Sequence, residues 1–238
     1  MTVGCFKFDL CLMLPELHRL SGSDSPLLAV YPNFGLSTKM AEVLQPYNAG
    51  VFNTLPDLPT AEESFVSKGG PDLVDKVLKP MIERYQLESK LGVGLLHRHF
   101  ELEDSEKLVE FNNISLPWTS NGDDHSGGKI LPSAWAVKDG GLTPYEFYYS
   151  PLGRDTHFNF DTAEPFVRQF IQAIGESNFE QTLSLRLFPG EGFSGALEIT
   201  EGRANINLLP DQVCVAPALS CSSLITDTIL GFRRWMER

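Results

Sequence analysis

Two histidines separated by one residue, His97 and His99, are the side chains in this sequence whose types and spacing best suit chemistry. If residues 92–102 form a strand, both imidazoles project from one face, about 6.6 Å apart along the chain. Two imidazoles at that separation can bind one metal ion, and Glu101 would share the face as a third ligand. The spacing therefore predicts a metal site of His97, His99 and Glu101, with iron, copper or zinc as the transition metal. Two further ligands could come from Glu103, His125 or His157.

The same histidines can also act without a metal. An imidazole with a pKa near neutrality can transfer a proton, and Glu198 or Glu146 could orient the ring. The candidate catalytic residues are therefore His97, His99 and Glu198. The structural alternative is a pair of ring nitrogens that are hydrogen-bonded inside a sheet and take part in no reaction.

Polar side chains on the other expected strands define a candidate surface for a small ligand. A strand face that serves only solubility tends to carry lysine, whereas this one carries short or planar donors and acceptors. These residues are Glu146 and Tyr148, Ser184 and Arg186, Glu198 and Thr200, and Asn205 and Asn207. We expect Tyr148, Asn205 and Arg203 to bind the substrate, with Arg203 recognising an anionic group. A face left in water and a surface ion pair of Arg203 are the structural alternatives.

The elements that must position these residues are mostly strands joined by tight turns. Asp139-Gly140-Gly141 and Glu201-Gly202 are turn signals, each between two short strands. The alternation of apolar and polar residues predicts strands at 92–102, 134–137, 145–149, 183–188, 195–200 and 203–209, and a compact apolar run predicts one more at 27–31. The remaining stretches are expected to be a helical turn or two at 104–111 and a polar loop at 112–128.

Helices are predicted from apolar residues at helical spacing. One helix is expected over about 72–88, with a kink near Lys76 because Pro80 lacks a backbone donor. A second begins after a capping signature at Asp161 and stops at Gly175, and a third covers about 223–237. A long surface connection is expected over 46–71, where Pro, Gly and Asn are frequent. The fold class predicted is α+β, a mainly antiparallel sheet with helices packed on one face.

Composition limits the classes of partner and the location. The chain has 238 residues and a formal charge of −12, which argues against a nucleic-acid partner and against anionic membrane surfaces. No signal peptide and no membrane span is recognisable. Two cysteines lie near each end of the chain, without the close spacing of a zinc ribbon, which is typical of reduced thiols; a disulfide or a four-sulfur metal site is the alternative. We therefore expect one domain over residues 1–238, located in the cytoplasm, with a small molecule as its ligand. Nothing in the sequence indicates an oligomeric state.

Two resemblances add expectations. His97-Arg98-His99 followed by Glu103, and Pro151-Leu152-Gly153 followed by His157, resemble the two metal motifs of the cupin barrel, which implies a site of His97, His99, Glu103 and His157 for iron, manganese, copper or zinc. Residues 92–100 and 198–205 are also similar to an uncharacterised family of small intracellular proteins of filamentous fungi. That resemblance implies a fungal cytosol and no particular reaction.

The sequence thus predicts a small-molecule enzyme that uses the histidine pair on a polar sheet face, with a metal or by proton transfer. The alternative is a non-enzymatic protein that binds a small molecule or a partner protein with the same face. The reaction class stays open among oxygenation, hydrolysis and isomerisation.

Overall fold

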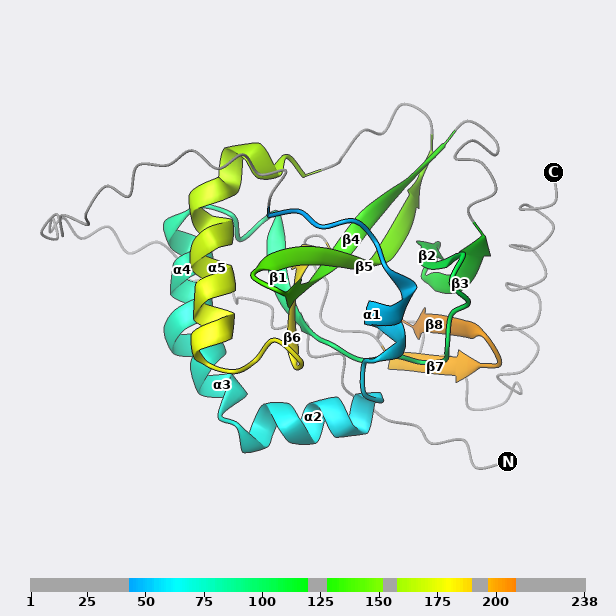
Figure 1. Cartoon of the computed structure of the whole chain (residues 1–238), viewed down its shortest axis with the longest axis horizontal. Coiled ribbons are helices and arrows are strands. Elements are labelled where there is room, and N and C mark those ends of the chain that lie inside the picture. The colour runs from blue at the N-terminus through cyan, green and yellow to red at the C-terminus, as the bar shows by residue number, and fades with distance from the viewer. Residues whose placement is uncertain (1–42, 120–127, 152–157, 190–196, 209–238) are drawn as a thin grey trace, which may run out of the picture.

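The structure, a computed structural model, describes residues 43–119, 128–151, 158–189 and 197–208. The strand expected at 27–31, the helix expected at 223–237, His125, His157 and the four cysteines lie outside these residues. Within them the chain forms a curled sheet accompanied by helices (Figure 1). None of the helices in this part of the chain is both long enough and apolar enough to span a membrane.

The sheet has eight strands in the order β1-β6-β4-β5-β2-β3-β8-β7. Every neighbouring pair is antiparallel except β2 and β5, which are parallel. The α+β class with a mostly antiparallel sheet is therefore confirmed. The strands are β1 Leu91–Leu95, β2 Glu106–Phe111, β3 Ile114–Thr119, β4 Lys129–Lys138, β5 Gly141–Ser150, β6 Leu183–Leu187, β7 Leu197–Glu201 and β8 Ala204–Leu208.

Three hairpins are closed by residues with positive φ. Asp139 and Gly140 have φ of 49° and 74° between β4 and β5, and Gly202 has φ of 62° between β7 and β8, as their sequences predict. Asn112 and Asn113, with φ of 51° and 64°, turn β2 into β3 in the same way. The helical turn expected at 104–111 and the loop expected from 112 are therefore wrong as far as Thr119, because the Asn-Asn pair is a hairpin turn.

Helix α5, Glu164–Glu176, confirms the best helix signal in the sequence. A short 3₁₀ turn, η3 Phe160–Ala163, precedes it, and the side chain of Asn159 accepts a hydrogen bond from the backbone N–H of Asp161. The apolar stripe of α5 is buried, and Phe166 and Phe170 are fully enclosed. The helix continues one residue past Gly175, and Asn178 takes the left-handed conformation that follows its end.

The helix expected over 72–88 is divided where Pro80 predicts an interruption. It comprises α3 Gly70–Leu73, a π-helical turn η2 Val74–Leu78, and α4 Lys79–Arg84. The N–H of Lys79 bonds to the carbonyl of Val74, five residues back, immediately before the proline. The wider turn therefore lets the helix continue past Pro80, which has no backbone N–H to donate.

The surface connection expected over 46–71 is wrong, because it contains α1 Ala49–Asn53 and α2 Leu58–Ser67. The side chains of Asn48 and Asp57 cap the two helices. Pro59 lies in the first turn of α2, where a missing N–H costs no intrahelical bond. Residues typical of loops thus serve here as helix starts.

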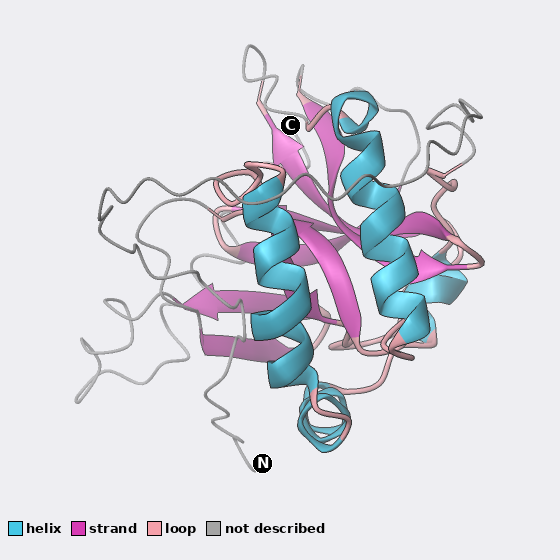
Figure 2. Cartoon of the chain, turned by 90° about the vertical axis from the view of Figure 1, so that its left-hand side faces the viewer, coloured by secondary structure: helices cyan, strands magenta, loops and turns pink. Residues whose placement is uncertain are grey.

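Helices lie on both faces of the sheet, so the prediction of a single covered face holds only in part. Trp135 and Val137 of β4 belong to the core cluster that includes Phe166 and Phe170 of α5. The alternate residues of β4, Ala134 and Ala136, pack instead with residues of α1. Figure 2 shows α5 beside the helical segment that includes α4, both across one face.

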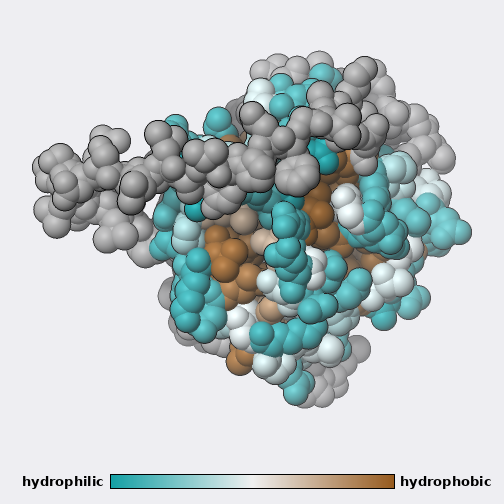
Figure 3. All heavy atoms as spheres, turned by 60° about the vertical axis from the view of Figure 1, so that its left-hand side comes forward, coloured by the Kyte–Doolittle hydropathy of each residue, from teal (hydrophilic) through white to brown (hydrophobic). Residues whose placement is uncertain are grey.

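The helical layer leaves apolar side chains visible between polar ones (Figure 3). Val66 and Val77, at 61% and 40% exposure, are the large apolar residues most open to solvent in the part of the chain that the structure describes. Met81 and Ile171 are partly buried against the core beneath. The apolar side chains of this layer are therefore mainly the outer members of a packed core.

The strand register unites the polar side chains on the face opposite α5. Ser184 pairs with Ala136, Arg186 with Ala134, and Ala134 with Glu146, and the same face continues through β2 and β3 to β8 and β7. We call this face, with Ala134 among its members, the polar face. Its polar members are Ser184, Arg186, Glu146, Tyr148, Glu110, Ser115, Asn205, Asn207, Thr200 and Glu198. The set of strand residues that the sequence assigns to one face is therefore confirmed.

A bulge in β5 changes the direction of one aromatic side chain. Tyr145 is an extra residue between Pro144 and Glu146, whose partners Trp135 and Ala134 are consecutive. Tyr145 therefore packs in the α1 cluster, where its hydroxyl donates to Ser184 at 3.0 Å.

Two glycines of β1 provide a matched test of how closely the Arg186 side chain packs against this strand. A Cβ on Gly94 would lie 2.9 Å from Cδ of Arg186, whereas one on Gly92 meets nothing within 4 Å. We expect Gly94→Ala to lower the free energy of unfolding by about 1–3 kcal/mol, because the Arg186 side chain must move. Gly92→Ala should raise it by about 0.5 kcal/mol. Urea unfolding measures both values, and equal effects would contradict the packing.

Candidate functional site

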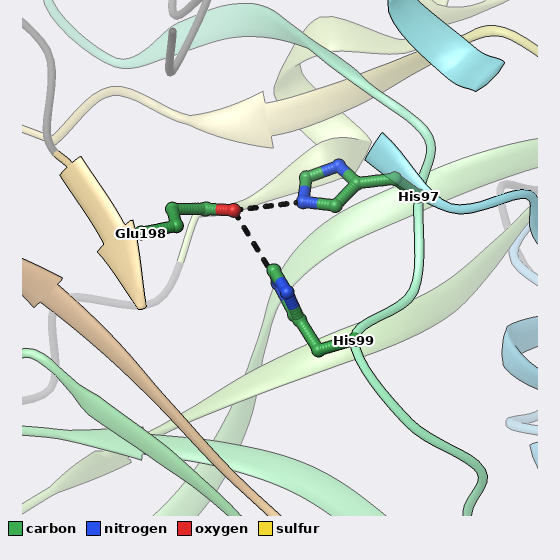
Figure 4. Close-up of side chains that lie close together, drawn as sticks. All are labelled: His97, His99 and Glu198. Atoms are coloured by element: carbon green, nitrogen blue, oxygen red, sulfur yellow. Dashed lines mark hydrogen bonds and ion pairs between the residues drawn. The ribbon is translucent and has the colours of Figure 1, made fainter. Parts of the chain in front are cut away.

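His97, His99 and Glu198 meet at one point, drawn in Figure 4. Nε2 of His97 lies 3.0 Å from Oε2 of Glu198, and Nε2 of His99 lies 3.5 Å from the same oxygen. The three side chains are 7%, 7% and 10% exposed. One ligand atom from each residue falls within 4.8 Å of the other two.

The strand expected over 92–102 is too long, since β1 ends at Leu95. The histidines lie on the chain that leaves β1, after Leu96 has been buried against α1. Glu198 lies on β7, the strand at the opposite end of the strand order. The site therefore depends on the curl of the sheet, which brings its two edge regions together.

The second nitrogen of each imidazole is also held. Nδ1 of His97 lies 3.1 Å from the carbonyl oxygen of Leu95. Nδ1 of His99 lies 3.2 Å from the hydroxyl of Thr200 on β7. These contacts fix both rings so that their Nε2 atoms face the Glu198 carboxylate.

The carboxylate controls the charge of the first ring. Burial disfavours the charged imidazole, but the hydrogen bond and the negative charge of Glu198, together with the charge of Glu146, raise the pKa of His97 to about 9. Burial works against ionised Glu198 as well, yet the hydrogen bond and charge of His97 keep its pKa below the usual range. In the metal-free protein at neutral pH, the two therefore form an ion pair.

His99 has the opposite tendency. Burial and the neighbouring charge of His97 outweigh the attraction of Glu198 and lower the pKa of His99 to about 4. Its ring is therefore neutral at neutral pH, with Nε2 available as a lone-pair donor when Nδ1 carries the proton. Glu146, next to Arg186, His97 and Glu198, has a pKa raised by burial.

Glu101 does not join the histidines, which corrects the expected ligand set. Its carboxylate is 78% exposed and pairs with Arg98 at 3.0 Å. A strand would have turned Glu101 to the same face, but the chain has left the sheet before that position. Glu103, implied as a ligand by the cupin resemblance, is exposed and lies outside the cluster. Glu198 takes the place of a carboxylate close in sequence.

The three residues expected to bind substrate have different surroundings. Arg203 forms a two-pronged ion pair with Glu106 and also donates to the carbonyl of Glu101 at 3.0 Å. The surface ion pair, the alternative for Arg203, is therefore what the contacts support. Asn205 and Tyr148 lie on the polar face, and Asn205 is 3% exposed.

Thr200 contacts His99, and the sequence did not indicate this contact. It belongs to the polar strand residues, but its contact with His99 joins segments 101 positions apart. The alternation in β7 places Thr200 beside Glu198 on one face, and only the curl brings both to the histidine segment. No local sequence signal could have identified the contact.

A cavity of about 440 Å³ lies elsewhere, between the chain before α1 and the β4–β5 turn. Its lining includes Gln45, Asn48 and Lys138, and none of the three clustered residues. Several of its polar groups bond to one another, since Gln45 contacts both Thr143 and the Lys138 carbonyl. The histidine cluster therefore has the stronger chemical case.

Comparison with known proteins gives no assignment. No protein-family model matches the chain, and neither the curated proteins nor the solved structures provide a match. The function is therefore argued from the residues of this chain.

The His97–Glu198 pair predicts how stability depends on pH. Since the pKa of His97 is about 9 in the folded chain and 6.5 for an unperturbed histidine, the folded protein binds more protons than the unfolded chain between these values. In metal-free protein, the free energy of unfolding should fall by up to about 3 kcal/mol as the pH rises from 6.5 to 9. This contribution is fully present below pH 6.5.

Urea unfolding in the presence of a chelator, at several pH values, measures the decline. His97→Gln is the control, because glutamine can donate to Glu198 but does not titrate. The difference between wild type and variant should shrink as the pH rises. Parallel curves for the two proteins would contradict the ion pair.

Proposed function

We propose that the protein is a metal-dependent enzyme acting on a small molecule, with His97, His99 and Glu198 as the metal ligands. The observation that carries the proposal is the convergence of two Nε2 atoms on one carboxylate oxygen, while each Nδ1 is held by another group. Histidines that bind metals usually donate their second ring N–H to a carbonyl or other acceptor. The Leu95 carbonyl and the Thr200 hydroxyl can fill this role.

The two nitrogen–oxygen distances in the cluster agree with a shared ion. Two ligand atoms that each lie about 2.1 Å from a metal, at angles between 90° and 109°, are about 3.0–3.4 Å apart. The two Nε2–Oε2 separations are 3.0 and 3.5 Å. The three ligand atoms lie within 4.8 Å of one another, so the two imidazoles must move closer together when a divalent cation replaces the proton.

The number of ligands favours catalysis over structure. Structural zinc sites are closed by four protein ligands, whereas catalytic sites use three and keep a position for water or substrate. Two histidines and one carboxylate also form the ligand set of non-haem iron oxygenases. Three ligands converge within the part of the chain that the structure describes, and this set supports a reactive metal, with iron or zinc as the metals to test first.

The metal would polarise a bound water or a substrate oxygen. His97 and His99 would hold it through Nε2, and Glu198 would supply the negative charge. Glu146 and Arg186, both close enough to Glu198 to affect its environment, would balance charge beside the centre. Hydrolysis, oxygenation and isomerisation are all compatible with this arrangement.

Metal binding by untagged, full-length protein tests the proposal. We expect one Zn²⁺ per chain by elemental analysis after dialysis, and loss of at least about 100-fold in affinity for His99→Ala and for Glu198→Ala, since each removes a ligand. Thr200→Val should weaken binding by about 10-fold, because it removes only the contact to Nδ1.

Glu101→Gln and Glu103→Gln are the matched controls, because they remove nearby carboxylates that do not face the histidines. Both should bind zinc as the wild type does. Failure to bind zinc or Fe²⁺ would contradict the proposal, and so would binding that survives Glu198→Ala. The cluster would then be an ion pair that holds the edge regions of the sheet together.

A further inference from the structure

Asn205 carries a polar atom that is buried without a partner. Its side chain is 3% exposed, and Oδ1 has no hydrogen-bond partner among the described residues. A buried acceptor that stays unpaired costs free energy comparable to a lost hydrogen bond. Oδ1 is also shielded from bulk water, and a molecule bound within the fold can supply the donor that the described residues lack.

The position of this atom relates it to the candidate metal centre. Asn205 on β8 lies directly opposite Thr200 on β7, the residue that contacts His99. Side chains directly opposite each other in an antiparallel pair have Cβ atoms about 5 Å apart. One side chain, that of Thr200, thus connects Asn205 to His99, a ligand of the proposed metal.

The second amide atom of Asn205 sets the direction of the first. Nδ2 donates to Oδ1 of Asn207 at 3.5 Å, and Asn207 lies opposite Glu198. Because the two amide atoms diverge from Cγ, Oδ1 is directed away from Asn207. Asn205 also pairs with Ser115 across the other edge of β8, and the Ser115 side chain is 7% exposed.

The groups near Oδ1 define the chemistry that it can recognise. An amide oxygen accepts hydrogen bonds, so the complementary group is a hydroxyl or an N–H. Arg203, the cation expected to recognise a carboxylate, is already bound to Glu106. Arg186 lies close to the charges of Glu146 and Glu198. The polar face therefore favours donor groups over an anionic group.

From these contacts we infer that Asn205 is a specificity-determining residue, and that the substrate is an uncharged small molecule whose hydroxyl or N–H donates to Asn205 Oδ1 while a neighbouring oxygen reaches the metal. The inference rests on the proposed function, because the metal centre supplies the second point of attachment. Polyols, sugars and primary amides share this chemistry. A substrate held through a carboxylate would not satisfy Oδ1.

A matched pair of probes tests the inference on full-length protein loaded with Mn²⁺. Ethylene glycol and 1,2-dimethoxyethane have two oxygens in the same arrangement, but only ethylene glycol has hydroxyl donors. The paramagnetic ion speeds the NMR relaxation of probe protons that bind close to it, and Zn²⁺-loaded protein gives the diamagnetic reference. Water-proton relaxation and Mn²⁺ stoichiometry report the metal centre separately.

We expect ethylene glycol to show about fivefold stronger relaxation enhancement than the dimethyl ether, the advantage of one hydrogen bond to a buried acceptor. Asn205→Leu should abolish this preference and leave Mn²⁺ stoichiometry unchanged. Asn205→Asp keeps an acceptor and should keep the preference, which also covers the case in which the leucine variant does not fold.

The outcomes separate the two proposals. If neither Zn²⁺ nor Mn²⁺ binds, or both bind equally well to Glu198→Ala, the metal centre fails and the inference about Asn205 fails with it. If Mn²⁺ binds but the two probes behave alike, or the preference survives Asn205→Leu, the inference alone is overturned. Oδ1 would then be satisfied by a buried water rather than by a substrate.

Discussion

One imidazole faced by two acceptors is the constraint on which the rest of the site depends. His97 has the Leu95 carbonyl at Nδ1 and the Glu198 carboxylate at Nε2, at 3.1 and 3.0 Å. Neither oxygen can donate when Glu198 is ionised, so a neutral imidazole would leave one contact without a hydrogen. Both contacts are satisfied only when Nδ1 carries a hydrogen and a proton or another cation lies between Nε2 and Oε2. A proton meets this requirement in the metal-free protein, and a divalent cation meets it in the proposed enzyme.

The fold brings this arrangement about by curling a sheet whose outer strands are β1 and β7. The chain leaving β1 carries the histidines to β7, where Glu198 and Thr200 lie on the same face. The polar face has two parts. Near α1 it includes Ala134 and Ala136, which pack in one cluster with Phe52, whereas towards β8 it is polar and includes Asn205. The part packed against α1 is rigid, and it lies beside the part near β7 and β8 that carries the candidate site.

Several elements of this arrangement could be predicted from sequence, because they depend on local patterns. Alternation placed Glu146, Arg186, Glu198 and Asn205 on one face, which requires no knowledge of strand order. The choice of Glu101 as a ligand was wrong because it assumed that the strand of His97 continues, whereas β1 stops at Leu95. Which distant carboxylate meets the histidines depends on the curl of all eight strands, and no local pattern encodes that. The Asn112–Asn113 turn, by contrast, is a local signal that should have predicted the β2–β3 hairpin.

The most direct measurement is a crystal structure of the full-length protein soaked with Zn²⁺, with anomalous diffraction recorded at the zinc edge. The account predicts one strong anomalous peak about 2.0–2.2 Å from Nε2 of His97, Nε2 of His99 and an oxygen of Glu198, with at least one further position open to water. A peak bound to other residues, or an undisturbed His97–Glu198 hydrogen bond in a crystal that holds zinc elsewhere, would contradict it.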